Sequence, residues 1–159
     1  MDLQIDYIEY SPITRSLDIF TIGCNGNCKN CYNPEIKDFN LKGLSISEAV
    51  FKIRDLNNQF DKLIDRIFLV GGDPVDGEKA TYGGTRSLVC YIKNFTDKPI
   101  YLFTRHKLED IPQSLKECVD FIKTGAYIPE LTVDNNIQYG IKLATSNQKI
   151  YKKIDGEWT

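Results

Sequence analysis

Two short apolar segments place the strongest limit on how this chain can fold. RIFLV, residues 66–70, and PIYLFT, residues 99–104, lack the polar alternation of a half-exposed strand. Such runs suit strands that are buried on both faces of a parallel sheet. Segments with helical periodicity alternate with the strand candidates, at about 45–60, 85–95 and, interrupted by a proline, 108–118. This alternation predicts right-handed βαβ units.

Two further segments, SLDIFTI at 16–22 and VDFIKTG at 119–125, have strand character. A closed barrel of eight β/α units needs about 250 residues, whereas this chain has 159. We therefore predict one α/β domain, residues 1–159, built as a partial, open β/α barrel of mostly parallel strands. The tail alternates polar and apolar residues around Asp155-Gly156, which predicts a small C-terminal antiparallel hairpin.

Charge and composition exclude several classes of partner. The net charge is -2 and no block of basic residues is present, so nucleic acid is not an expected partner. The first residues, MDLQIDYIEY, are acidic where a secretory signal is basic, and no apolar run approaches the roughly 18 residues of a membrane span. We expect a cytoplasmic protein without a membrane partner. In that reducing compartment, clustered cysteines favour metal over disulfides.

Three cysteines share one loop after the first predicted strand, with the spacing C-x3-C-x2-C: Cys24, Cys28 and Cys31. A structural zinc site usually has four ligands, and His106, the only histidine, could supply a fourth, although a surface role suits its position better. Cys90 and Cys118 fall in apolar helical segments, where free cysteine is expected to pack in the core.

An iron-sulfur cluster held by three thiolates explains the loop better, because one iron is then left without a protein ligand. An open metal position is typical of a site that binds substrate. Gly23 and Gly26 allow the backbone to wrap closely around a cluster, and the loop amides can donate to its sulfurs.

This loop resembles the signature of the radical S-adenosylmethionine (SAM) superfamily. The resemblance implies a 4Fe-4S cluster whose open iron is chelated by SAM. Reductive cleavage of SAM then yields a 5'-deoxyadenosyl radical that abstracts a hydrogen atom. GGDP, residues 71–74, follows the second predicted strand, where the superfamily has a glycine-rich contact with the amino group of SAM; by itself this tetrapeptide also makes an ordinary turn.

Within the superfamily, the chain is most similar to the activating enzyme of anaerobic ribonucleotide reductase, a glycyl-radical activase. The similarity rests on CYNPE after the third cysteine, on Arg15, and on SNQK at residues 146–149. It implies an anaerobic oxidoreductase that installs a glycyl radical on a large protein partner, with an electron donor such as flavodoxin or ferredoxin. The chain departs from the family at Asn30, usually glycine, at Lys149, usually arginine, and at residues 12–14, where the family has a glycine-rich run.

The resemblance assigns site residues position by position. Three irons are expected on the cysteines of the loop, and the expected neighbours of SAM are Asn30, Tyr32, Gly71, Gly72, Asp73 and Thr104. Arg105 could touch the cofactor or cap the strand in solvent, and Tyr127 follows a strand at the same edge. No residue is assigned as a catalytic acid, base or nucleophile.

Two other functions remain open from the sequence. One is a radical SAM enzyme that modifies another peptide or a small molecule. The other is an iron-sulfur or zinc module that transfers electrons or scaffolds a complex without chemistry. Iron content together with SAM cleavage under dithionite separates these possibilities.

Overall fold

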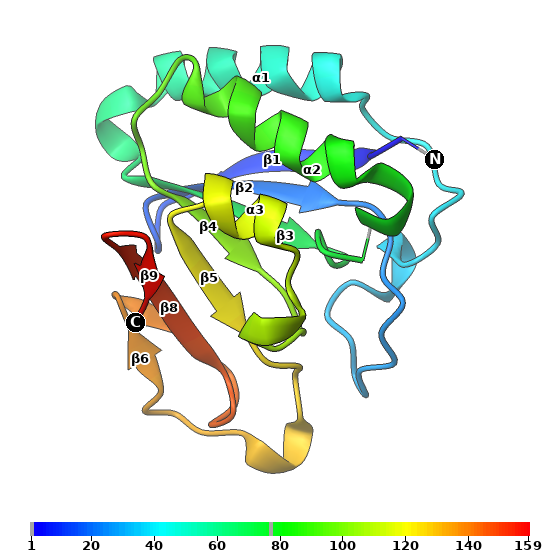
Figure 1. Ribbon diagram of the computed structural model, residues 1–159, viewed down its shortest axis with the longest axis vertical. Helices are drawn as coiled ribbons and strands as arrows, with labels where there is room; N and C mark the ends of the chain where they lie inside the picture. Colours follow the sequence, from blue (N-terminus) through cyan, green and yellow to red (C-terminus); the bar gives the residue numbers. More distant parts are fainter. Residues whose placement is uncertain (1, 77) are drawn as a thin grey trace.

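The protein is a mostly parallel sheet with helices packed on one face (Figure 1). The computed structural model describes residues 2–76 and 78–159, without the side chains of residues 78–83. One sheet has the order β1-β2-β3-β4-β5-β8-β9. Its strands are β1 (Ile5–Ser11), β2 (Ser16–Thr21), β3 (Arg66–Gly71), β4 (Ile100–Phe103), β5 (Phe121–Thr124), β8 (Lys149–Ile154) and β9 (Glu157–Trp158). The separate hairpin strands and the helices are β6 (Ile137–Gln138), β7 (Ile141–Lys142), α1 (Ile46–Gln59), α2 (Glu78–Lys93) and α3 (Gln113–Cys118).

The four central strands, β2 to β5, are parallel neighbours, as the apolar runs predicted. Leu17 of β2 lies opposite Ile67 of β3, and Leu69 lies opposite Leu102 of β4. Helix α1 connects β2 to β3, α2 connects β3 to β4, and α3 connects β4 to β5. The carboxyl ends of these four strands therefore share one edge of the sheet, where ligands of open α/β sheets usually bind.

The outer strands are antiparallel. β1, which the sequence did not suggest to us, pairs with β2, and β8 pairs with β5. The predicted Asp155-Gly156 hairpin is confirmed: both residues have positive φ (51° and 81°) and join β8 to β9, as a two-residue turn of this type requires. The α/β class, the mostly parallel sheet and the hairpin are thus confirmed, and the partial barrel remains a prediction.

Both faces of the parallel strands are buried, which is why their sequences are apolar without alternation. Ile67 and Leu69 of β3 face the core cluster that includes residues of all three helices, while Phe68 between them belongs to a second cluster. In that second cluster, side chains of β3, β4 and β5 pack against residues from the β7 and β8 region: Phe68, Tyr101, Phe121, Ile141, Leu143 and Ile150. The C-terminal segment therefore covers the face that the helices leave free.

Helix α1, within the segment 45–60 whose periodicity predicted a helix, is capped by Ser45. The Ser45 side chain accepts from the Glu48 amide (3.2 Å), and Glu48 Oε2 accepts from the Ser45 amide (2.8 Å). This reciprocal pair satisfies two helix-end donors.

Two expectations about α2 and its cysteine were wrong. The helix begins at Glu78, earlier than the predicted start at residue 85. Cys90 is exposed rather than packed in the core, because Leu88 and Ile92 occupy the buried face and residue 90 points the other way at 3.6 residues per turn. Cys118, in contrast, is half-buried and packs against the main core.

Among the described residues, none of the helices combines the length and the apolar character needed to cross a bilayer.

Candidate metal centre and cofactor cavity

The cysteine loop follows β2 at the carboxyl edge of the sheet and is held from two sides. On one side, the Gly23 amide donates to Ile36 O (2.8 Å) and the Cys24 amide to Lys37 O (3.1 Å). On the other side, the Asp73 amide donates to Gly23 O (2.8 Å). The loop after β2 and the turn after β3 therefore form one bonded unit.

Two glycines in this unit have a backbone reason to be glycine. Gly23 has φ +107°, and a Cβ there would lie 2.2 Å from the Phe39 ring. A Cβ on Gly72 would lie 2.2 Å from Gly23 O. The GGDP turn thus needs glycine in order to pack against the cysteine loop, independently of any contact with a cofactor.

The three cysteines open onto one cavity of about 290 Å³ at this edge. Of the six residues predicted to neighbour the cofactor, five line the same cavity: Tyr32, Gly71, Gly72, Asp73 and Thr104. Its wall also includes residues of later segments: Val70, Phe103, Arg105, Lys123, Gly125, Tyr127 and Gln148. The arrangement brings together segments that follow β2, β3, β4 and β5.

Asn30 and Tyr32 differ in how they relate to this cavity. Asn30 is not among the lining residues, but its φ of 57° is left-handed. Glycine adopts that conformation freely and asparagine tolerates it better than most residues, which explains how asparagine can replace the usual glycine. Tyr32 lines the cavity and is 96% exposed, so its ring lies at the rim.

Asp73 and Thr104 bond to each other across the edge. The Asp73 carboxylate is almost fully buried and accepts from Thr104 Oγ1 (2.8 and 3.0 Å), from the Arg105 amide (3.0 Å) and from the Val75 amide (3.0 Å). Burial raises the pKa of Asp73, and the neighbouring Asp76 adds to this, while the hydrogen bonds work in the opposite direction. Asp73 therefore ties the end of β4 to the end of β3, and its contact with a cofactor remains a prediction.

Lys123 is a cavity residue that the sequence analysis missed. It stands in β5 and its Nζ donates to Gly125 O (2.9 Å). Burial lowers its pKa to about 8, although the nearby Asp73 and Cys28 favour the charged form. The available signal was a lysine inside the otherwise apolar strand FIKT, because a charge at such a position is seldom buried without a function.

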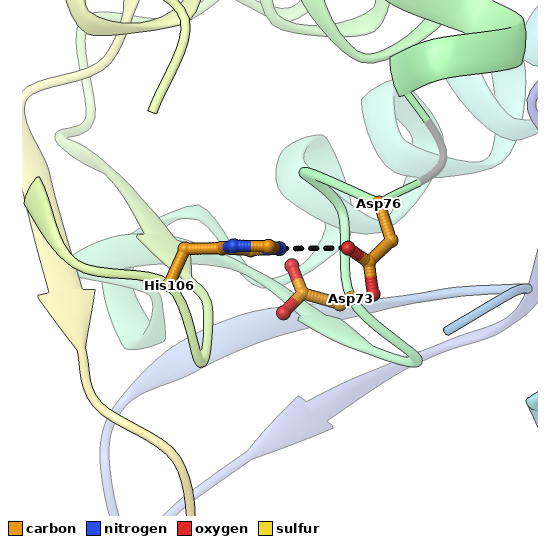
Figure 2. A group of neighbouring side chains, drawn as sticks. All are labelled: Asp73, Asp76 and His106. Atoms are coloured by element: carbon orange, nitrogen blue, oxygen red, sulfur yellow. Dashed lines mark hydrogen bonds and ion pairs between the residues drawn. The ribbon is translucent and has the colours of Figure 1, made fainter. Parts of the chain in front are cut away.

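Asp76 was also missed; its side chain lies beside Asp73 and bonds to His106 (Figure 2). Its carboxylate accepts from the Asn25 amide (2.8 Å) and from Arg105 Nη2 (2.9 and 2.8 Å), and its Oδ1 lies 2.7 Å from His106 Nε2. Burial favours a higher pKa for Asp76, but the hydrogen bonds from His106, Asn25 and Arg105 outweigh it and hold the pKa below its ordinary value. The only signal was its place five residues after β3.

The donor set in the cavity fits an iron-sulfur cluster with three protein thiolates. The Gly26 amide donates to Cys24 Sγ (3.3 Å), as a loop that wraps cluster sulfurs is expected to do. Burial raises the pKa of the Cys24 thiol, and the Gly26 amide and Arg105 oppose this shift. His106, the candidate fourth ligand for zinc, is bonded to Asp76 and is not among the residues lining this cavity.

Arg15 and the SNQK segment, which supported the resemblance, both make hydrogen bonds within the fold. Arg15 precedes β2, at the opposite end of the sheet from the cysteines, and its Nε donates to Asp65 (2.7 Å). Gln148 Oε1 accepts two amides of its own turn, and Asn147 Nδ2 donates to Ala126 O (2.9 Å). The SNQK segment thus fixes the turn after β5 at the cavity rim.

Comparison with known proteins agrees with this site. A profile described as "4Fe-4S single cluster domain" matches residues 14–151. The chain is 29% identical, over 143 residues, to the anaerobic ribonucleoside-triphosphate reductase-activating protein of Enterobacteria phage T4, covering 88% of this chain and 85% of that protein. It is 30% identical, over 67 residues, to a putative glycyl-radical enzyme activating enzyme of Methanocaldococcus jannaschii, covering 42% of this chain and 24% of that protein. Among solved structures there is no significant match. The predicted relationship to radical SAM activases is confirmed.

Proposed function

The chain belongs to the family of 4Fe-4S single cluster domains, and on that premise we propose that it is a radical SAM enzyme that activates a glycyl-radical protein. The observation that carries the proposal is the cavity in which Cys24, Cys28 and Cys31 meet the Gly71-Gly72 turn and a half-buried lysine, Lys123. Residues 1–159 would act as one domain, in the cytoplasm.

Cys24, Cys28 and Cys31 would hold the cluster through three thiolates and would leave one iron open to SAM. Such a cluster would supply the electron for reductive cleavage of the SAM sulfonium. The bonds of the loop to Ile36 and Lys37 on one side and to Asp73 on the other keep the three thiols facing the cavity.

The remaining cavity residues suit the charges of SAM. Gly71 and Gly72 bring backbone close to the position expected for the SAM ammonium group, and the Asp73 charge lies behind them. Lys123 faces the same cavity with an ammonium whose only protein hydrogen bond among the described residues is to a neutral carbonyl, Gly125 O. A carboxylate would pair with that ammonium far better, so we assign Lys123 to the SAM carboxylate.

A polypeptide is the substrate class that we favour. The phage T4 relative is named as the activating protein of an anaerobic ribonucleoside-triphosphate reductase, and we propose a comparable partner here, whose glycine is the hydrogen donor. The edge offers space for a polypeptide: two further cavities, of about 350 and 550 Å³, share Arg105 with the cysteine cavity. Exposed Tyr32, at the cysteine cavity, and exposed Ile128, at the two further cavities, would contact the partner. The electron would come from a flavodoxin or ferredoxin.

The test is anaerobic reconstitution of the full chain with iron and sulfide. We expect about four irons per chain and release of 5'-deoxyadenosine from SAM under dithionite. Addition of an anaerobic ribonucleotide reductase subunit should then give a glycyl-radical EPR signal.

The outcomes separate the alternatives. Bound zinc without SAM cleavage would overturn the proposal in favour of a metal-binding module. Cleavage without a radical on the protein partner would favour an enzyme acting on another peptide or a small molecule.

A further inference from the structure

Arg105 has a partly exposed guanidinium with one fully buried nitrogen, Nε. It follows β4, and its Nη2 donates to both oxygens of Asp76 at 2.9 and 2.8 Å. Its Nε is buried and has no hydrogen-bond partner among the atoms that the structure describes; Asp73 Oδ2, at 3.9 Å, is too far away. A buried donor left unpaired is destabilising, so this N–H is expected to have a partner in the working protein.

The unpaired N–H lies against the cysteine loop at Gly26. A Cβ placed on Gly26 would be 2.6 Å from Arg105 Nε and 3.3 Å from Cys24 Sγ. The nitrogen and the sulfur thus both border the volume that a Cβ would fill, and glycine at position 26 leaves that volume free. Cys24 Sγ is the sulfur of a predicted cluster ligand and can accept a hydrogen bond here, and Arg105 opposes the rise in the pKa of its thiol.

Asp76 bonds both to Arg105 and to the cysteine loop beside Cys24. Its side chain is 5% exposed, and the same carboxylate holds the guanidinium of Arg105 and the backbone amide of Asn25, which follows Cys24. Both bonds to Asp76 come from Nη2, so the carboxylate anchors that corner of the guanidinium and leaves Nε for another acceptor. Asp76 therefore sets where Arg105 Nε points relative to the loop.

The same group is not well suited to a metal ion of its own. Asp73, Asp76 and His106 offer ligand atoms within 4.8 Å of one another. However, both Asp76 oxygens already accept from a guanidinium, and the Asp73 oxygens accept from Thr104 and two backbone amides. A cation would have to displace Arg105, which already supplies the positive charge.

We propose that Arg105 donates its Nε–H to the Cys24 thiolate of the bound cluster and that Asp76 is the positioning residue for this contact. The inference rests on the proposed function, because it requires a cluster at the three cysteines. The cluster with three thiolates carries net negative charge, which increases by one on reduction. A hydrogen bond from a cation to a ligand sulfur stabilises the reduced form more than the oxidised form and makes the cluster easier to reduce.

The test is a redox titration of the reconstituted full chain, followed by the EPR signal of the reduced cluster. Arg105→Gln should bind iron as the wild type does but be reduced at a more negative potential. A charge within about 4–6 Å shifts a titration equilibrium by about tenfold or more, so the reduced-to-oxidised ratio at a fixed potential should fall by about that factor. Arg105→Lys keeps the charge but not the fork that spans Asp76 and Cys24, and it should also require a more negative potential.

Arg15→Gln is the matched control, since Arg15 is also paired with an aspartate but lies at the other end of the sheet. It should titrate like the wild type. If Arg105→Gln or Arg105→Lys assembles the cluster and titrates like the wild type, or if Arg15→Gln shifts as much, the proposal is overturned. A wild-type chain that assembles no four-iron cluster would instead overturn the proposed function itself.

The role of Asp76 is tested by a double-mutant cycle. Asp76→Asn removes a negative charge in any background, but it releases the guanidinium only where Arg105 is present. We expect its shift in potential to differ between the wild-type and Arg105→Gln backgrounds. Equal shifts would show that Asp76 acts through its charge alone and would refute its positioning role.

Discussion

Replacing Lys123 with methionine should stabilise the metal-free protein while weakening its affinity for SAM. Burial lowers the pKa of Lys123 from 10.5 to about 8. At about 1.4 kcal/mol per pKa unit, the folded state is destabilised by roughly 3 kcal/mol at neutral pH compared with an unshifted lysine. Methionine removes this charge and keeps most of the side-chain volume. It also loses the bond to Gly125 O, worth about 1 kcal/mol, so the net gain should be about 2 kcal/mol.

The pH dependence identifies the cause of that gain. Because the unfolded chain holds the lysine proton up to its ordinary pKa while the folded chain releases it near pH 8, stability is lost as pH falls from about 10.5 through about 8. The loss is complete below that range and absent above it. Urea unfolding of the metal-free protein should therefore show the full advantage of Lys123→Met at pH 7 and roughly half of it or less at about pH 9.5.

Binding should change in the opposite direction. A hydrogen bond to a charged group is worth about 1.5–3 kcal/mol, so the reconstituted Lys123→Met protein should bind SAM at least about tenfold more weakly by calorimetry. The same substitution at exposed Lys52 should leave the affinity unchanged. Wild-type affinity in Lys123→Met would refute the carboxylate assignment, and a stability difference independent of pH would refute the argument from burial.

Three further predictions concern the loop and the helix start. Cys28→Ala should lower the iron content from about four per chain to near zero. Cys90→Ala, at an exposed position of α2, should leave the iron content unchanged; the reverse result would show that the ligands are misassigned. Gly72→Ala should lower the free energy of unfolding by about 1–3 kcal/mol, because its Cβ would meet a carbonyl at 2.2 Å. Unchanged urea unfolding would mean that the turn relaxes freely. Ser45→Ala should lower unfolding free energy by about 1 kcal/mol through loss of the α1 cap, and a loss below a few tenths would contradict the capping role.

The elements predicted from the sequence were those whose signal is local. RIFLV and PIYLFT became β3 and β4, because a run without polar alternation suits a strand buried on both faces. The helical periodicity at about 45–60 became α1. β1 was not anticipated, although it forms a hairpin with the adjacent β2, because residues 12–15 between the two strands lack the Gly, Asn or Asp that usually mark a hairpin turn. Cys90 was misassigned because the apolar character of its segment was considered without the direction of its side chain.

By itself, the sequence determined the class of the sheet and the three thiols that we propose as cluster ligands, since the burial pattern of strands and the spacing of thiols are encoded in contiguous residues. Only the tertiary structure decided which polar residues from distant segments lie next to the cysteine loop. Lys123, Arg105 and Asp76 follow or occupy different strands, and they meet at the cysteines because parallel strands end along one edge. Strand register and packing across the sheet set those contacts. Neither can be predicted from the sequence immediately around Lys123, Arg105 or Asp76.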